Sequence, residues 1–250
     1  MIGIEFLSYF IVLALAAEIL GTIGGFGSSL LFVPVAGLFF DFHSVLGITA
    51  LFHVSSNVAK IALFKNGIDK KLILTIGIPS VICVITGAYL TRFFDNYLLE
   101  TLLAGFLIVL SSLLLIYKTF ELKPTIFNAL WGGSLSGLMA GLLGTGGAIR
   151  GLTLAAFNLK KEIFIATSAV IDLGVDLSRG VVYYSNGFMH YHDLYLVPIL
   201  LVVSVIGTYA GKKLLNRLPQ AIFKRIVLFL ILSVGLLTLT MQLWSFFNQA

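Results

Sequence analysis

The feature that most constrains this chain is a set of glycine-containing motifs that recur about 120 residues apart. Each copy lies in a long apolar stretch, so the motifs repeat together with the hydropathy pattern. Duplicated, glycine-interrupted apolar segments are typical of membrane proteins whose two related halves enclose a site near the middle of the bilayer. The sequence therefore predicts two transmembrane repeats, residues 1–122 and 123–250. The corresponding motifs are Gly24 and Gly27 with Gly144 and Gly147, Asn66-Gly67 with Asn186-Gly187, and Gly87 with Gly207.

The composition places most of the chain in lipid. Hydrophobic residues make up 59% of the sequence and charged residues 11%, whereas about a quarter of the residues in an ordinary soluble domain are charged. The loops are too short to hold a separate catalytic or nucleic-acid-binding module. We therefore expect an all-α polytopic membrane protein. Its apolar runs, each able to reach across or deep into a hydrocarbon core about 30 Å thick, lie at about 5–40, 44–64, 72–91, 97–117, 126–158, 163–184, 194–211 and 222–247.

The first run of each half is too long for one transmembrane helix, because about 20 residues already span the hydrocarbon core. Both runs, 5–40 and 126–158, contain a glycine cluster in their interior, where the chain can reverse sharply. We therefore divide each into a longer arm and a shorter arm, about 5–22 with 28–40 and about 127–143 with 148–158. Two arrangements remain open: a re-entrant hairpin, or one long kinked helix.

The distribution of Lys and Arg favours the hairpins. If each broken segment exits where it entered, twelve basic residues fall on one side of the membrane and only Arg92 on the other. Such a bias marks the cytoplasmic side. The same parity inverts the two repeats, of about five helical segments each, and puts both termini outside the cell. Kinked single helices would instead give eight crossings and parallel halves, with five Lys and Arg residues on one side of the membrane and eight on the other.

Six charged residues lie within the apolar runs: Glu18, Lys60, Arg150, Asp172, Asp176 and Arg179. Ionisable groups in lipid cost about 3 kcal/mol each on insertion scales, so we expect most of them to face a cavity or one another. Asp172, Asp176 and Arg179 are spaced i, i+4, i+7 and form one helical stripe. His53, Asn57 and Lys60 form the same stripe in the first half.

These stripes also have simpler interpretations. Lys60 and Arg179 lie four or five residues from a helix end, so either side chain can extend to the headgroups instead of facing the interior. The side chains of Asp172 and Asp176 are too short to reach the headgroups. For them the alternative is a structural ion pair, with Asp176 bound to Arg179 at i, i+3.

Arg150 is the sharpest candidate for anion binding. It follows the Gly144–Gly147 reversal by about one turn, at the start of a short helix whose free backbone N–H groups attract anions. A guanidinium there offers bidentate recognition of an oxyanion. We expect the backbone at Gly146-Gly147 and at Gly27-Ser28 to complete the site. The alternative is an ion pair between Arg150 and Glu18 or an aspartate.

The two glycine-rich segments also resemble those of a known family. Gly21-Thr-Ile-Gly-Gly-Phe-Gly27, followed by Pro34, and Gly141-Leu-Leu-Gly-Thr-Gly-Gly147 stand at the start of the two halves. Together with the size and the duplication, they resemble the TauE/SafE family of sulfite exporter-like permeases. The resemblance implies transport of small sulfur-containing anions, such as sulfite, sulfonates or related organosulfur acids, across a bacterial cytoplasmic membrane. It assigns no individual substrate ligands.

The sequence thus predicts a secondary transporter that moves a small anion by alternating access. The predicted substrate-binding residues are Arg150, Gly146, Gly147, Gly27, Ser28, His53, Asn57, Lys60 and Arg179. Asp172 or Asp176 is the candidate carrier of a coupled proton. An anion channel that uses the same basic residues is the first alternative.

A membrane enzyme is the second alternative, and it is disfavoured because the sequence offers no set of nucleophile, base and orienting group. We expect no cofactor, no metal and no nucleic-acid partner. His190, His192 and Asp193 are spaced like a metal cluster but lie in a short polar loop, and Cys83 is expected to pack as a small apolar residue. The oligomeric state stays open, a homodimer included.

Overall fold

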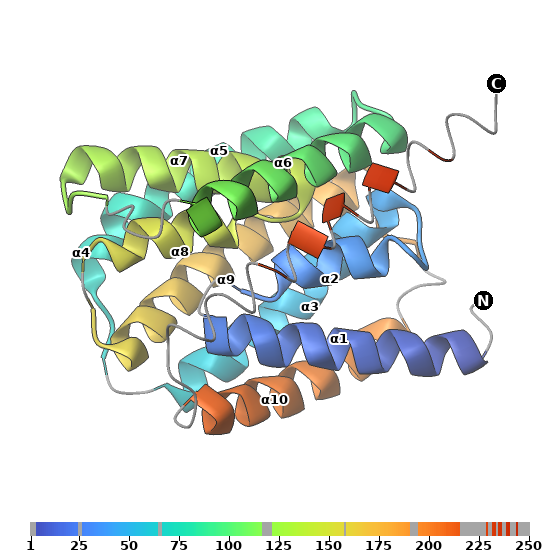
Figure 1. The fold of residues 1–250 in the computed structure, drawn as a ribbon, viewed down its shortest axis with the longest axis horizontal. Coiled ribbons are helices and arrows are strands. Elements are labelled where there is room, and N and C mark those ends of the chain that lie inside the picture. Colours follow the sequence, from blue (N-terminus) through green and yellow to red (C-terminus); the bar gives the residue numbers. More distant parts are fainter. Residues whose placement is uncertain are drawn as a thin grey trace.

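The computed structural model describes residues 4–24, 27–64, 67–116, 122–157, 159–190 and 195–215, together with scattered positions between 229 and 244. Within these residues every regular element is helical (Figure 1). The elements are α1 (Ile4–Gly24), α2 (Ser29–Ala36), α3 (Phe42–Leu63), α4 (Lys70–Leu72), the π-helix η1 (Ile73–Gly77), α5 (Ile78–Thr91), α6 (Asn96–Ile116), α7 (Ile126–Leu143), α8 (Gly147–Ala155), α9 (Lys161–Ser185) and α10 (Leu196–Leu215).

Six of the described helical segments are long and apolar enough to cross a membrane: α1, α3, the continuous segment α4–η1–α5, α6, α7 and α10. α9 is also long, at 25 residues, but it carries three charged side chains in its middle. α2 and α8 have 8 and 9 residues, which is about 12–14 Å of helix and less than half of the hydrocarbon core. The molecule is therefore a multi-pass membrane protein with two short internal helices.

Both short helices fold back on the long helix before them. In the first half, a Cβ atom at Gly21 would lie 2.4 Å from the Ser28 backbone, and the rings of Phe10 and Phe39 are 5.4 Å apart. The chain reverses at Gly27, whose φ of +81° favours glycine. This is the hairpin alternative of the sequence prediction, and the single kinked helix is not seen.

The second half repeats the reversal. Ser136 of α7 donates a hydrogen bond to the carbonyl oxygen of Gly146 at 2.8 Å, and Gly132, further back on α7, contacts Thr153 near the end of α8. Gly144 ends α7 with a φ of +73°. The two hairpins therefore have the same construction.

Packing between the halves is reciprocal. α1 packs against α10 and α7 packs against α5, while α3 and α9 pack against each other (Figure 1). A Cβ atom at Gly87 of α5 would lie 2.5 Å from the Leu138 carbonyl of α7, and one at Gly207 of α10 would lie 2.7 Å from Glu18 Cγ of α1. The offset of the sequence motifs relates these two contacts, so the same close approach occurs twice.

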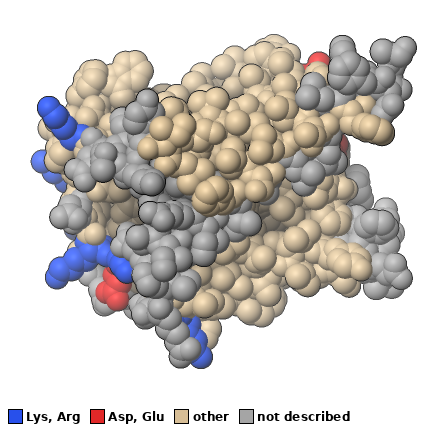
Figure 2. Space-filling model, viewed as in Figure 1, with Lys and Arg blue, Asp and Glu red and all other residues tan. Residues whose placement is uncertain are grey.

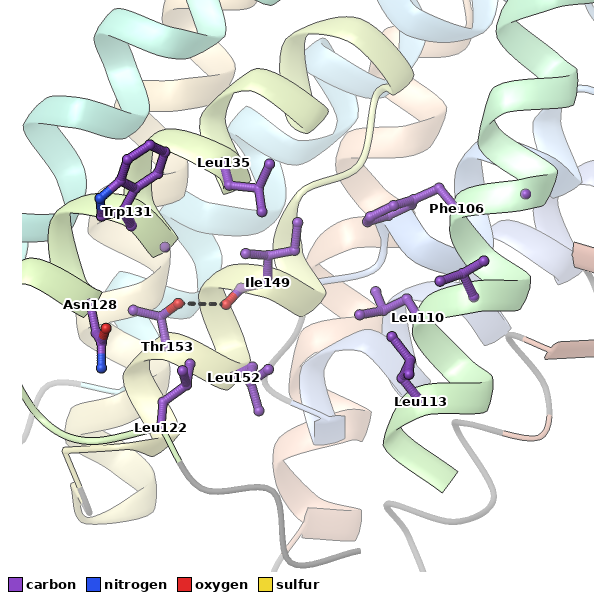
Figure 3. Close-up of a pocket in the computed structure, with 13 residues that line it drawn as sticks. Phe106, Leu110, Leu113, Leu122, Asn128, Trp131, Leu135, Ile149, Leu152 and Thr153 are labelled. Atoms are coloured by element: carbon purple, nitrogen blue, oxygen red, sulfur yellow. Dashed lines mark hydrogen bonds between the residues drawn. The ribbon is translucent and has the colours of Figure 1, made fainter. Parts of the chain in front are cut away.

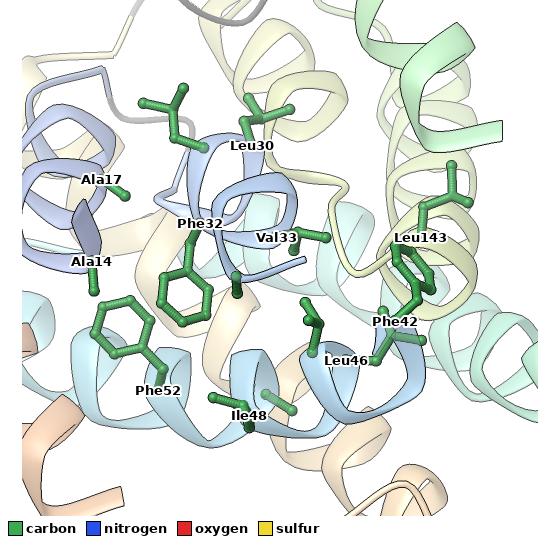
Figure 4. Close-up of a cluster of buried hydrophobic side chains, with 14 of the residues drawn as sticks. Ala14, Ala17, Leu30, Phe32, Val33, Phe42, Leu46, Ile48, Phe52 and Leu143 are labelled. Carbon is green, nitrogen blue, oxygen red and sulfur yellow. The ribbon is translucent and has the colours of Figure 1, made fainter. Parts of the chain in front are cut away.

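A cluster of buried apolar side chains holds α2 in place. Phe32 of α2 points toward Phe52 of α3 (Figure 4), and the two ring centroids are 4.6 Å apart. Ala14 and Ala17 of α1 close the cluster from the other side. α2 is apolar around its whole circumference and almost completely buried, as expected for a helix surrounded by protein. This packing fixes the position of the first hairpin turn.

The charged surface is asymmetric. Figure 2 shows the Lys and Arg side chains of this face gathered at its left end, which is the end where α4 lies in Figure 1. Among the described residues, the rest of this face carries few charges, as expected of a surface that meets lipid.

Candidate functional site

The turns of the two hairpins meet at the centre of the molecule. Thr145 donates a hydrogen bond to Ser29 at 3.3 Å, and a Cβ atom at Gly27 would lie 3.9 Å from Nη2 of Arg150. The starts of α2 and α8 have no side-chain cap. The structure thus places Gly27, Ser28, Gly146, Gly147 and Arg150 where the two turns meet.

Arg150 is buried, and each of the three nitrogens of its guanidinium has a partner. Its two terminal nitrogens bind the two carboxylate oxygens of Asp172 in a bidentate ion pair, and its Nε donates to Ser168 Oγ at 3.1 Å. The Arg150 side chain is 2% exposed and that of Asp172 is 16% exposed. The structure therefore shows Arg150 in one of the predicted alternatives, the ion pair with an aspartate.

Arg179 and Asp176 form a second buried ion pair, at 2.6 Å and with i, i+3 spacing. Asn57 of α3 donates to Asp176 at 2.7 Å. Nη1 of Arg179 donates to the carbonyl oxygens of Ala140 and Gly144, at 3.0 and 2.8 Å. This pair ties α9 to the end of α7, where four carbonyl groups lack intrahelical partners.

Lys60 and Glu18 form a third pair, at 2.9 Å. Glu18 is completely buried, and both carboxylate oxygens accept further hydrogen bonds from four hydroxyl groups. The donors are Ser28 and Ser56 at 2.6 Å, Thr208 at 3.0 Å and Thr22 at 3.1 Å. These donors come from α1, α3, α10 and the first hairpin turn, so Glu18 holds four parts of the chain together.

Neither Lys60 nor Arg179 extends to the surface. The two residues are 6% and 1% exposed, and each ends on an internal carboxylate. The alternative that placed them at the headgroups is therefore wrong for this structure. The physical reason is that each cation finds an acidic partner inside its own half, Glu18 of α1 for Lys60 and Asp176 of α9 for Arg179.

His53 connects two of the ion pairs. Arg179 Nη2 lies 3.4 Å from His53 Nδ1, and His53 Nε2 lies 3.0 Å from Ser28 Oγ. A guanidinium can only donate, so Nδ1 accepts and the ring proton is on Nε2. Ser28 then accepts from His53 and donates to Glu18. A directed chain of hydrogen bonds thus runs from Arg179 to Glu18, across the two halves.

A small cavity separates the Arg150 pair from the Lys60 pair. Its volume is about 10 Å³, roughly enough for one water molecule. Asp172 is the most exposed of the six central charged side chains. Because the cavity has room for only about one water molecule, the centre is closed in this conformation. The cavity is lined by Gly21, Thr22, Gly27, Lys60, Ile165, Ser168, Ala169 and Asp172.

A much larger pocket lies elsewhere in the described chain. It has a volume of about 760 Å³ and lies between α6, α7 and α8 (Figure 3), where Phe106, Leu110, Trp131 and Leu152 line it. Its lining contains no ionisable residue. A charged partner strengthens the binding of an oxyanion, and the buried cations Lys60, Arg150 and Arg179 all lie at the central ion pairs. We therefore place the candidate site there and not in this pocket.

Several site residues were missed at the sequence level. Ser56 and Ser168 each stand one turn before a central charged residue, Lys60 and Asp172, and that spacing was a usable signal. Thr208 gave no signal, because its role depends on how α10 packs on α1. His192 and Asp193 lie outside the described residues, and among the described ones no group of three His, Cys, Asp or Glu is placed to hold a metal ion.

Long apolar helices that enclose paired charges at their centre are typical of membrane transport proteins. The comparisons with known proteins agree. The family model described as sulfite exporter TauE/SafE matches residues 9–238, and the chain belongs to this family of membrane transporters.

Two curated relatives extend over most of the chain. The probable membrane transporter protein YdhB of Bacillus subtilis is 28% identical over 244 residues, which is 92% of this chain and 98% of the relative. The probable membrane transporter protein MJ0441 of Methanocaldococcus jannaschii is 24% identical, over 81% of this chain and 82% of its own length. No solved structure matches the chain significantly.

Proposed function

We propose that the protein is a secondary transporter that carries small sulfur-containing anions, such as sulfite or sulfonates, across the cell membrane by alternating access. The observation that carries the proposal is the position of Arg150. It lies at the start of α8, between the two glycine reversals, and it is buried at the point where both halves meet. A permanent planar cation there suits an oxyanion.

The proposed substrate site includes groups from both halves. Lys60 and Asp172, the partner of Arg150, line the small central cavity, and we assign binding to Arg150 and Lys60 with the backbone at Gly27, Gly146 and Gly147. The remaining members are Ser28, His53, Asn57 and Arg179. We assign proton coupling to Asp172 or Asp176.

Packing supports an inverted relation between repeats 1–122 and 123–250. Asn57 and Asp176 occupy equivalent positions in the stripes of α3 and α9, and they contact each other. Two equivalent residues that touch must lie near the axis that relates the halves. The turn of the first hairpin lies beside the end of α3 and the start of α9, whereas the second turn contacts the start of α3. Turns placed in this way are expected of hairpins that enter from opposite ends, as the proposed inverted arrangement requires.

The closed centre supports a carrier. A channel needs a continuous path for its ion, whereas the central cavity holds about 10 Å³. A site that opens to one side at a time is consistent with such an enclosed centre. The charge asymmetry supports a cytoplasmic location of the basic end, which puts both termini outside the cell.

Binding and exchange measurements on the purified protein test the function. We expect sulfite and a short alkanesulfonate to bind and to exchange across proteoliposome membranes with saturation kinetics, and we expect chloride and ammonium not to compete. Flux that rises without saturation would favour the channel. Absence of binding for all sulfur-containing anions would contradict the proposed substrate class.

A further inference from the structure

The six charges at the centre of the protein add up to zero. Three cations and three carboxylates form the pairs Glu18–Lys60, Arg150–Asp172 and Arg179–Asp176. An anion that enters this region adds a negative charge with no counter-ion. An unpaired charge in a region of low dielectric constant is costly. The anion must therefore enter together with a positive charge.

The three carboxylates are not equivalent acceptors for that charge. Glu18 is bound by Lys60 and four hydroxyl groups. Asp176 is bound by Arg179 and Asn57, and Arg179 is itself held by two backbone carbonyls. Within the described residues, Asp172 has only Arg150 as a hydrogen-bonding partner, and it lines the central cavity. Asp172 is thus the carboxylate with the fewest contacts to break.

The Arg150 side chain stays oriented without Asp172. Its Nε donates to Ser168, and only the two terminal nitrogens are occupied by the aspartate. Those two nitrogens form the planar fork that a second oxyanion would use. The fork is therefore exchangeable, while the stem and Nε hold the guanidinium in position.

We propose that Asp172 is an exchangeable counter-ion, whose place on the Arg150 fork is taken by the substrate anion when Asp172 binds a proton. This inference rests on the proposed function. In the exchange, a proton from solvent bonds to a carboxylate oxygen of Asp172, and two oxygens of the anion accept the released N–H groups of Arg150. A monoanion and one proton leave the net charge at zero.

The surroundings of Asp172 are compatible with this exchange. The charged groups that act on it are Arg150 from α8, Lys60 from α3, and Asp176 and Arg179 from α9 itself. The other elements packed against α9, namely α5, η1 and α7, contain no Asp, Glu, Lys, Arg or His. Lys60 lines the same cavity and compensates part of the charge of the entering anion.

The test is the number of protons taken up when an anion binds to the full-length protein in detergent. The probe is a short alkanesulfonate, which stays a monoanion across the pH range, whereas sulfite itself titrates. Calorimetry in two buffers with different ionisation enthalpies gives the uptake. For the wild type we expect about one proton per anion, and an affinity that falls about tenfold for each unit of rising pH once Asp172 is ionised.

Three variants identify the proton acceptor. Asp172→Asn should bind the sulfonate with no proton uptake and no pH dependence. Asp176→Asn should keep the uptake of about one proton, as should Asp95→Asn, a control at the exposed start of α6. Uptake that survives in Asp172→Asn, or is lost in Asp176→Asn alone, would overturn the assignment.

The wild-type measurement decides the question even if a variant fails to fold. Sulfonate binding without proton uptake would overturn the exchange and leave the proposed transporter function standing. If neither sulfonate nor sulfite binds to the wild type, the proposed function fails, and the exchange fails with it.

Discussion

At the scale of single residues, the centre of this transporter is a set of paired charges, and only the local pair could be read from the sequence. Asp176 and Arg179 are three residues apart on one helix, so their contact follows from helix geometry. The partner of Arg150 stayed open between Glu18 and an aspartate, because that choice depends on how α8 packs against α9. Lys60 and Glu18 lie on different helices, so their pairing also needed the fold.

The Arg150 side chain gives the first prediction at this scale. Arg150→Lys keeps the charge but loses the planar fork, and Arg150→Gln loses both. We expect transport to decrease in the order wild type, Lys, Gln, with a loss of at least tenfold for Gln, measured as exchange of labelled anion in proteoliposomes. Arg92→Gln, at the exposed end of α5, is the matched control and should transport normally.

A structural role for Arg150 predicts a different result. If the guanidinium serves only to neutralise Asp172, the double variant Arg150→Gln with Asp172→Asn should recover transport. Near-normal anion binding by a folded Arg150→Gln protein would remove this residue from the site.

Glu18 gives the second prediction, which concerns stability. Glu18→Gln leaves the Lys60 cation buried without a counter-ion and removes an acceptor of several hydrogen bonds. Breaking a buried ion pair in this way costs about 3–5 kcal/mol. We expect a clearly lower thermal unfolding temperature in detergent. Thr208→Val removes one hydrogen-bond donor and keeps the Glu18–Lys60 pair, so it should lower stability by about 1 kcal/mol. Equal losses of stability in the two variants would show that Glu18 acts only as one more hydrogen-bond acceptor.

At the scale of helices, the sequence was most informative where glycine permits a reversal. The predicted arms 127–143 and 148–158 correspond to α7 and α8, because the glycines between them allow the turn and the apolar residues on either side form helices. The depth and direction of α2 and α8 could not be predicted. They depend on contacts such as Phe32 with Phe52, which join distant segments.

Close packing of α7 on α5 gives a prediction at this scale. Gly133, Gly137 and Gly141 form a stripe on α7 that faces backbone carbonyls of the α4–η1–α5 segment. A Cβ atom at Gly137 would lie 2.1 Å from the backbone carbonyl oxygen of Ser80. Small residues allow such close approach of helices in membranes. Gly137→Ala must separate the two helices, at a cost of about 1–3 kcal/mol.

Gly105 of α6 provides the control, because a Cβ atom there would have no neighbour within 4 Å. Gly105→Ala should leave the unfolding temperature in detergent unchanged, while Gly137→Ala lowers it. Equal unfolding temperatures for the two variants would mean that α5 and α7 separate without cost.

At the scale of the whole molecule, repetition explains both the fold and the position of the site. The first long helix of each half packs on the helix of the other half that carries the Gly87 or Gly207 motif, α7 on α5 and α1 on α10, and the sequence offset relates these two contacts. α3 and α9 carry equivalent stripes and pack against each other. The two stripes differ in chemistry, since His53 stands where the second copy has Asp172, and the site is therefore asymmetric.

The orientation of the molecule in the membrane is the last prediction, and it follows from the end at which the basic residues gather. In a Cys83→Ala background, we expect Lys70→Cys to react with a membrane-impermeant thiol reagent only after the cells are opened. Asn248→Cys should react in intact cells, because an even number of crossings in the inverted arrangement puts both termini outside. Labelling of Lys70→Cys from outside, or protection of Asn248→Cys in intact cells, would contradict the inverted topology, since either result changes the number or direction of crossings that the paired hairpins require.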